Sequence, residues 1–453
     1  MGSIAVKQNE SDAGLHTLWL ASLGGALEFY DFVIFVFFTS VLAKLFFSAG
    51  TEEWLRQVET FGIFSVGYLA RPLGGVVLAH YGDTLGRKRV FTLSILLMAI
   101  PTLLIGLIPT YQSIGIAAPL LLVGMRILQG VAIGGEAPGA WVFVAEHARR
   151  RQTGFAIGLL TAGLSLGIFL GSLVATVMNV AFSSTQIEAG FWRIPFLIGG
   201  IFGFGALFLR QRLNETPVFE EIRSTAAAAR ELPLRLVLRK HSFGIAASVV
   251  STWTLTASIV VIILMTPALL GKLFHVDPFS AQLANLAGTA SLAVSTVVIG
   301  AATDRFGMRR VAVPILLVLI AGAYGLYAGV GQAPSLLLPF YILAGLGTGA
   351  VVLTPIVMVR AFPPLVRFTG VSFSYNVAYA VFGGLTPPFV AWLVHVNHLG
   401  PAHYVAVAGV AGIFATLVAP VGESVKEGRR LSVPLPAVKK LEENPFDNLC
   451  SGI

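Results

Sequence analysis

The sequence is short of charge and almost free of cysteine. Only 11% of its 453 residues are Asp, Glu, Lys or Arg, whereas soluble globular proteins carry about 25%. So few charges cannot cover a surface that faces water, which excludes an ordinary soluble fold. Cys450 is the single cysteine, so an intrachain disulfide and a cysteine-based metal cluster are excluded. The histidines lack the spacing of metal ligands, so we expect no metal and no other cofactor.

The sequence is instead rich in long apolar runs. Hydrophobic residues make up 56% of the chain, and its mean hydropathy is +0.83. A helix needs about 20 apolar residues to cross a bilayer. The pattern therefore predicts an all-α membrane protein with twelve transmembrane helices, at 18–47, 57–80, 90–110, 118–145, 153–180, 191–210, 243–270, 280–303, 311–331, 336–359, 368–396 and 402–421.

Basic residues gather in every second connection between these runs. The connections on the side of the two termini hold Arg87, Lys88, Arg89, Arg149, Arg150, Arg151, Arg305, Arg309, Arg310, Arg360 and Arg367. Because positively charged connections stay in the cytoplasm, we expect a multi-pass protein of the bacterial inner membrane with both termini cytoplasmic. The net charge of +8 then reflects topology and contacts with membrane lipids, and we expect no nucleic-acid partner.

The chain divides into two similar halves. "AHYGDTLGRKRV" at 79–90 matches "GAATDRFGMRRV" at 300–311, and "RQTG" at 151–154 matches "RFTG" at 367–370. A duplicated six-helix unit indicates two bundles with a site between them near the membrane midplane. Two such bundles form a complete unit, so we expect a monomer. The predicted parts are an N-terminal bundle, a cytoplasmic linker, a C-terminal bundle and a cytoplasmic tail, at 1–210, 211–242, 243–421 and 422–453.

Several segments resemble those of a known family. The Asp-x-x-Gly-Arg-Lys-Arg pattern after the second span, with its partner after the eighth, is similar to the signature of the major facilitator superfamily. Segments that resemble its metabolite:proton symporter branch are "GALEFYDF" (25–32), "YLARPLGG" (68–75), "RILQGVAIGGEAPGA" (126–140), "FWRIPFLIGG" (191–200), "NETPVF" (214–219) and "VRFTGVSFSYNVAYAVFGG" (366–384). The resemblance covers the whole chain. It implies the major facilitator fold and transport, with a proton, of citrate or another di- or tricarboxylate, 2-oxoglutarate, shikimate, proline or betaine.

Of the charged residues within predicted spans of the first half, five are candidates for a role in transport: Glu28, Asp31, Arg71, Arg126 and Glu136. Glu28 and Asp31 are three residues apart and share one helix face. Unpaired charge at midplane is costly, so we expect these acids and bases to meet one another or to line water. Burial disfavours a charged carboxyl and a nearby Arg favours it, so Asp31, Glu136 and Glu28 are candidate proton sites. Alternatively, Glu28, Asp31, Arg71 and Arg126 form ion pairs that hold helices together.

Candidate substrate-binding residues lie in both halves. Arg71 and Arg126 suit a carboxylate, which pairs well with a guanidinium. The polar residues predicted to bind substrate beside them are Tyr30, Tyr375, Asn376 and Tyr379. Amide and phenol groups within a span must find partners, so those of the second half bond either a substrate or a neighbouring backbone.

The repeated loops predict a cytoplasmic gate. Glycine permits their tight turns, and an Asp beside basic residues suits a latch that breaks when the inside opens. The candidate gate residues are Asp83, Gly86, Arg87, Lys88, Arg89, Glu146, Asp304, Arg305, Gly307, Arg309 and Arg310. Arg360 stands where the family usually has Glu, so we expect the charge network of the second half to differ from that of relatives.

These observations favour a proton-coupled symporter that imports a small organic metabolite by alternating access. Its partners would be protons and a substrate that is most simply a carboxylate such as citrate. One alternative is an osmolyte symporter for proline or betaine. The resemblance implies a long coiled-coil tail for the osmosensing members of the family, and the residues after Val421 show no heptad repeat, which disfavours this alternative. Another is a membrane sensor that binds without transport. No nucleophile or cofactor motif is present, so we expect no enzyme.

Overall fold

The computed structural model describes residues 2–48, 50, 62–63, 65–78, 87–149, 151–211 and 233–418, which form helices joined by short connections, without a strand. Ten of the helices in this part of the chain are long and apolar enough to cross a membrane. The predicted spans 57–80 and 90–110 correspond to a helix over 65–78 and to α4, whose apolar part is Leu93–Leu107. The all-α class is therefore confirmed, and the twelve predicted spans are consistent with the structure.

The helices of the first half are α1 (Gly2–Phe37), α2 (Thr39–Phe46), the helix over 65–78, α4 (Arg87–Leu107), α5 (Tyr111–Ile114), α6 (Ala117–His147), α7 (Thr153–Ala181), α8 (Ser184–Ala189), the short turn η1 (Phe191–Arg193) and α9 (Ile194–Gln211). The predicted run 18–47 is interrupted at Phe38. The Thr39 hydroxyl donates to the carbonyl oxygens of Phe35 and Val36, at 3.3 and 2.7 Å. Because these groups belong to the last turn of α1, the bond competes with a continuing helix.

The helices of the second half are α11 (Pro233–Lys240), α12 (Ser242–Ala257), η2 (Ser258–Met265), α13 (Thr266–Phe274), α14 (Pro278–Phe306), α15 (Met308–Tyr324), η3 (Gly325–Gly329), α16 (Val330–Gln332), η4 (Pro334–Leu336), α17 (Leu337–Thr348), η5 (Gly349–Val352), α18 (Leu353–Ala361), η6 (Pro364–Val366), α19 (Arg367–Val396) and α20 (Gly400–Val418). The widened π-helical turns η2 and η3 leave backbone carbonyls that need other donors. Asn285 Nδ2 donates to the Ile263 carbonyl at 2.8 Å, and Thr266 Oγ1 donates to that of Val261 at 2.7 Å.

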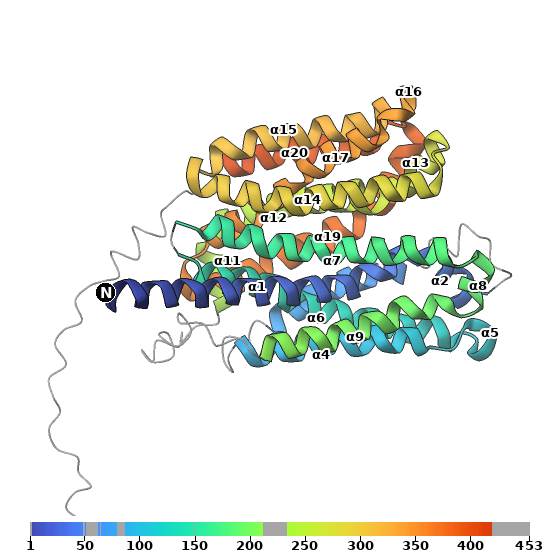
Figure 1. Ribbon diagram of the computed structural model, residues 1–453, viewed down its shortest axis with the longest axis horizontal. Helices are drawn as coiled ribbons and strands as arrows, with labels where there is room; N and C mark the ends of the chain where they lie inside the picture. Colours follow the sequence, from blue (N-terminus) through green and yellow to red (C-terminus); the bar gives the residue numbers. More distant parts are fainter. Residues whose placement is uncertain are drawn as a thin grey trace, which may run out of the picture.

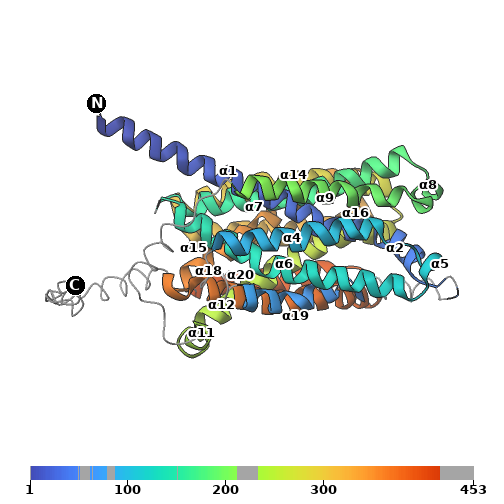
Figure 2. The ribbon, with the colours of Figure 1, turned by 90° about the horizontal axis from the view of Figure 1, so that it is seen from below.

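The long helices run side by side in two groups. In the first group α1 packs against α7 and α9, and α4 packs against α6 and α9. In the second group α12 packs against α19 and α20, and α15 packs against α17 and α20. Figures 1 and 2 show the two groups lying along each other, with α7 next to α14 and the short helices α5, α8 and α16 at the end opposite the N-terminus.

Glycines allow the two groups to meet closely along α7 and α14. A Cβ on Gly158 of α7 would lie only 2.7 Å from the Thr296 carbonyl oxygen of α14. Gly154 and Gly300 face each other near the end of the same seam, so a side chain on either would collide with the other backbone. Small residues permit such close approach between membrane helices, where packing replaces the hydrophobic effect as the driving force.

Candidate functional site

Asp31 lies inside the first group, between α1, α4 and α9. Its side chain is 1% exposed. A Cβ on Gly199 of α9 would lie 2.6 Å from Asp31 Oδ1 and 2.7 Å from the Thr102 methyl of α4, which places these three residues together. Neither carboxylate oxygen has a hydrogen-bond partner among the residues that the structure describes. We expected the buried acids and bases to meet one another or to line water; among the described residues, Asp31 makes no hydrogen bond to a base.

The other two candidate proton sites lie on α1 and α6. Glu28 precedes Asp31 by one helical turn, and its side chain lies outside the described residues. Glu136 is 4% exposed and follows Gly134 and Gly135. A Cβ on Gly134 would collide with the Arg71 carbonyl oxygen, so this glycine brings α6 against the helix over 65–78. Glu136 is therefore buried on the part of α6 that packs against this helix.

Arg126 is tied into the first group. Its Nη1 donates to Gln129 Oε1 at 2.8 Å and to the Phe32 carbonyl oxygen at 3.4 Å. Gln129 in turn donates to Thr102 at 2.8 Å. The guanidinium also lies 4.6 and 4.5 Å from the ring centres of Phe32 and Phe35. These contacts join α6 to α1 and α4, so part of the Arg126 side chain serves the packing of its own group.

Arg71 lies where the first group meets α19. Its guanidinium carbon is 4.0 Å from the ring centre of Tyr379, 5.1 Å from that of Tyr375 and 5.8 Å from that of Tyr68. Tyr68 and Tyr379 lie 5.2 Å apart, and Trp141 of α6 meets Tyr375 edge-on at 4.9 Å. Cations attract the faces of aromatic rings, so this contact joins the halves through one buried charge. We call Arg71, Tyr68, Trp141, Tyr375 and Tyr379 the aromatic cluster.

The aromatic cluster has hydrogen-bond donors to spare. Arg71 is 1% exposed, and its Nε and Nη2 have no hydrogen-bond partner among the described residues. Trp141, which contacts Tyr375, likewise has an indole Nε1 without a hydrogen-bond partner among the described residues. Buried donors without partners are costly. Two donors on one edge of a guanidinium match the two oxygens of a carboxylate, so the cluster suits an anionic ligand.

Two of the predicted substrate ligands are engaged elsewhere. Asn376 Nδ2 donates to the carbonyl oxygens of Gly134, at 2.6 Å, and Ser372, at 2.8 Å, which fastens α19 to α6. The Tyr30 hydroxyl donates to the Pro195 carbonyl at 2.9 Å and holds α1 against α9. The structure thus brings Tyr375 and Tyr379 to Arg71 but places Tyr30 within the first group, and the amide nitrogen of Asn376 bonds backbone.

Sequence reasoning missed Tyr68 and Trp141. Tyr68 precedes Arg71 by three residues and shares its helix face, so the spacing alone could have identified it. Trp141 had no such signal, because its place beside Tyr375 depends on how α6 packs against α19.

Charged contacts join the two halves at the end where α14 meets the beginning of α7. Asp304, at the end of α14, accepts hydrogen bonds from the backbone N–H groups of Gly154 and Phe155, both at 2.8 Å. These groups begin α7, where the positive end of the helix dipole favours an anion. Nearby, Arg367 Nη1 of α19 lies 3.6 Å from Glu146 Oε1 of α6. Both contacts therefore hold helices of one half to helices of the other.

The remaining candidate gate residues divide into exposed and undescribed ones. Gly307 has a φ of 84°, which a side chain would strain, so glycine allows the sharp turn from α14 to α15. Its neighbours Arg305, Arg309 and Arg310 are exposed. Asp83 and Gly86 lie outside the described residues, as do the side chains of Arg87, Lys88 and Arg89.

Comparison with known proteins finds transporters over most of the chain. A family model described as "Sugar (and other) transporter" matches residues 17–242. The proline/betaine transporter of Salmonella typhimurium is 30% identical, over 93% of this chain and 86% of its own length. The citrate-proton symporter of Klebsiella pneumoniae is 31% identical, over 87% of this chain and 89% of its own length. A putative proline/betaine transporter of Staphylococcus haemolyticus is 30% identical, over 90% and 89%.

Solved structures share the fold. The proton:xylose symporter XylE bound to 6-bromo-6-deoxy-D-glucose superimposes with a TM-score of 0.75 at 16% identity, covering 91% of this chain and 97% of that one. The inward open form of XylE from E. coli gives a TM-score of 0.63 at 16% identity, covering 91% and 98%. At this identity the likeness concerns the arrangement of helices.

Proposed function

The chain belongs to the major facilitator superfamily, in its branch of metabolite:proton symporters, and we propose that it imports a small organic carboxylate with protons by alternating access. It is a multi-pass membrane transporter and not an enzyme. The observation that carries the choice of a carboxylate is the buried edge of Arg71, whose Nε and Nη2 lack partners among the described residues. The relatives include a citrate-proton symporter, which supports the same class.

Osmolyte transport is the second candidate, because relatives are named proline/betaine transporters. A quaternary ammonium group binds best on open aromatic faces. In the aromatic cluster the faces of Tyr375 and Tyr379 are already turned to Arg71. A second cation there would be repelled by the guanidinium, so the cluster favours an anion over betaine.

For proton coupling we propose Asp31 as the main site, with Glu136 and Glu28 as the other candidates. A buried carboxylate without donors is strongly disfavoured, whereas the neutral acid is tolerated. Asp31 has no such donor among the described residues and adjoins Thr102. Through Thr102 and Gln129 it is connected to Arg126, which packs on Phe32. Gain or loss of a proton can thus alter the packing of α1, α4 and α6.

For alternating access we propose that 1–210 and 243–421 move as two bundles joined by the linker 211–242. Both termini would be cytoplasmic, and one chain would suffice for transport. The contacts of Asp304 with α7 and of Arg367 with Glu146 would close the cytoplasmic side and break when it opens. Opening a gate of this kind requires breaking contacts between two packed units that each remain intact.

The test is uptake into proteoliposomes with and without an inward proton gradient. The panel would hold citrate, 2-oxoglutarate, succinate, shikimate, benzoate, proline and betaine. We expect gradient-stimulated uptake of an acid, abolished by Arg71→Gln and unaffected by Arg239→Gln on the exposed face of α11. Gradient-driven uptake of betaine or proline alone, or uptake indifferent to Arg71, would contradict the proposal. Binding without any uptake would point to a sensor.

A further inference from the structure

The charges around the aromatic cluster limit how many carboxylates a substrate can carry. The second half has no Asp, Glu, Lys or Arg in 243–271, 278–303, 311–359 or 368–418. Its membrane helices therefore offer no cation to a ligand held between the halves. On the other side, the Nε–Nη2 edge of Arg71 has no hydrogen-bond partner among the described residues. Arg126 instead donates to Gln129 and lies against the rings of Phe32 and Phe35 within its own group. One guanidinium edge pairs with one carboxylate, and each further carboxylate would be desolvated without a partner.

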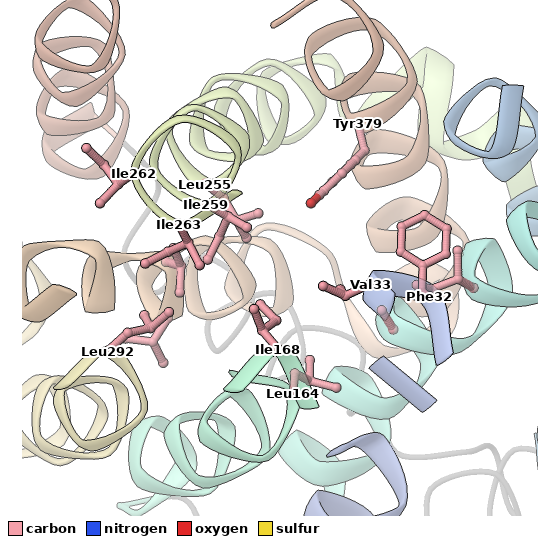
Figure 3. Packing of buried hydrophobic residues seen from close by; sticks show 14 of the residues in the cluster. Phe32, Val33, Leu164, Ile168, Leu255, Ile259, Ile262, Ile263, Leu292 and Tyr379 are labelled. Atoms are coloured by element: carbon pink, nitrogen blue, oxygen red, sulfur yellow. The ribbon is translucent and has the colours of Figure 1, made fainter. Parts of the chain in front are cut away.

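The side chains beyond Tyr379 are apolar. Figure 3 shows Leu164 and Ile168 of α7 facing Leu255 and Ile259 of the α12–η2 segment, with Val33 of α1 and Tyr379 of α19 turned toward the same space. Each of these six side chains is at most 8% exposed. Tyr379 links the two regions, because one face of its ring lies 4.0 Å from the Arg71 guanidinium while its hydroxyl points toward the apolar side chains. We call Val33, Leu164, Ile168, Leu255 and Ile259 the apolar wall.

Arg71 contacts Tyr379 through the centre of its guanidinium, whose carbon lies 4.0 Å from the ring centre. A carboxylate approaches a guanidinium in its plane, along an edge such as Nε–Nη2, where both Arg71 nitrogens lack a hydrogen-bond partner among the described residues. The contact with the ring therefore leaves these two donors available to a ligand. Because Tyr379 contacts Arg71 and its hydroxyl points toward the apolar wall, a ligand held on this edge can extend along Tyr379 toward that wall.

On the basis of the proposed function, we infer that the substrate is a monocarboxylate with an apolar body, and not a tricarboxylate or a zwitterion. Arg71 holds the carboxylate, and the apolar wall covers the rest of the molecule. The specificity-determining residues are Arg71 for the charge and Leu164 and Ile259 for the body. This class differs from the substrates that name the citrate-proton and proline/betaine relatives.

The test is calorimetric titration of the purified full chain with acetate, propanoate, butanoate and pentanoate, beside citrate, succinate, proline and betaine. Burial of a methylene group stabilises by about 0.8 kcal/mol, so affinity should rise roughly fourfold per added carbon. The Arg71→Gln variant, which lacks the anion partner, measures partition of the longer acids into detergent. We expect the affinity to rise with each added carbon in the wild type and to stay the same across the four acids in this variant.

Variants of the apolar wall give a second readout. Ile259→Ser should lower the affinity for pentanoate about tenfold or more and leave that for acetate within about twofold, because only the longer acid reaches this residue. Val298→Ser, on an exposed position of α14, is the matched control and should change neither. The titrations of the wild-type chain with the four acids test the inference by themselves, so the test stands even when a variant fails to fold.

The outcomes separate this inference from the proposed function. A flat series, or citrate, succinate, proline or betaine binding more tightly than pentanoate, would overturn the inference. Gradient-driven uptake of citrate would do the same while leaving proton-coupled carboxylate transport intact. Absence of binding by every acid would overturn both.

Discussion

Asp31 and Arg71 are both buried charges, but their surroundings differ. Arg71 meets aromatic faces from the other half of the chain, so its charge lies at the contact between the two groups. Asp31 faces the glycines of α9 within one group, where a Cβ on Gly203 would lie 3.1 Å from its Oδ2. If the two groups move relative to each other as proposed, a site between them suits the substrate, whereas a site inside one group suits a proton, which is small enough to bind within a packed unit.

Replacing Asp31 by Asn should uncouple transport from protons. The amide has the shape of the neutral carboxyl, so the first group should still fold, but it cannot release a proton. We expect gradient-driven accumulation to fall to background while exchange of substrate across equilibrated proteoliposomes continues. Asp277→Asn is the matched control, because Asp277 is an exposed cap that accepts from the Ser280 N–H. Full accumulation by the Asp31 variant would rule out Asp31 as the main proton site.

The π-helical turn η2 shows how one helix depends on others. Ser258–Met265 widens between α12 and α13, and its carbonyls are served by Asn285 of α14 and by Thr266. Thr266 also bonds the hydroxyl of Tyr327, which lies in the second π-helical turn, at 2.7 Å. The irregular backbone is tolerated in the membrane because neighbouring side chains satisfy it.

Asn285→Leu should therefore destabilise the second group. The substitution leaves the Ile263 carbonyl buried without its donor, which costs about 1–3 kcal/mol. We expect a lower midpoint of thermal unfolding in detergent. Asn179→Leu on α7 is the control, because Asn179 is exposed and bonds a carbonyl of its own helix. Equal midpoints for the Asn285 variant and the wild type would show that the π-helical turn does not need this bond.

Across the whole molecule, the two groups are held together by contacts of different character. The seam between α7 and α14 is packed through glycine backbone and ends in the Asp304 contact. The contact of α19 with α6 uses Asn376 in the middle of α19, and Arg367 with Glu146 where α19 begins and α6 ends. Arg360 lies close enough to Asp304 for their charges to interact. A Glu at position 360 would instead repel Asp304.

Asp304→Asn should shift the molecule toward a state open to the cytoplasm. The amide oxygen can accept only one of the two hydrogen bonds from α7, because the NH2 group that replaces the other oxygen is itself a donor. The charge that the helix dipole favours is also lost, which alone is worth about 1 kcal/mol or a fivefold shift in population. We expect a cysteine at Thr303, in a Cys450→Ser background, to react severalfold faster with maleimide from the cytoplasmic side. Thr303 is 2% exposed in the structure, so reaction requires opening.

The control for this labelling is Glu188→Gln. Glu188 pairs with Lys44 at 2.7 Å in an exposed contact at the opposite end of the molecule. Such surface pairs contribute little to stability, so the labelling rate should not change. A labelling rate that Asp304→Asn leaves unaltered would show that its charge does not hold the gate closed.

Several features could be read from the sequence with little ambiguity. The apolar runs located the membrane helices, because the length and apolarity that lipid demands are local properties of the chain. The repeated loops identified Asp304 and the neighbouring Gly307, since the duplication preserves their spacing. The paired segments beginning at 151 and 367 are the ones that meet Asp304 and Glu146, although the pattern did not say which partner each would find.

The sequence could not predict which neighbouring helix each buried side chain points toward. Helical spacing fixes which residues share a face, but the rotation of the helix about its axis depends on its neighbours. Asp31 and Tyr30 are adjacent in the sequence and both turn toward α9, and Asn376 bonds the backbone of α6. The length and apolarity that lipid demands determine which segments form membrane helices. Tyr375 and Tyr379, by contrast, reach Arg71 from a helix of the other half, so only the packing between the two halves selects them.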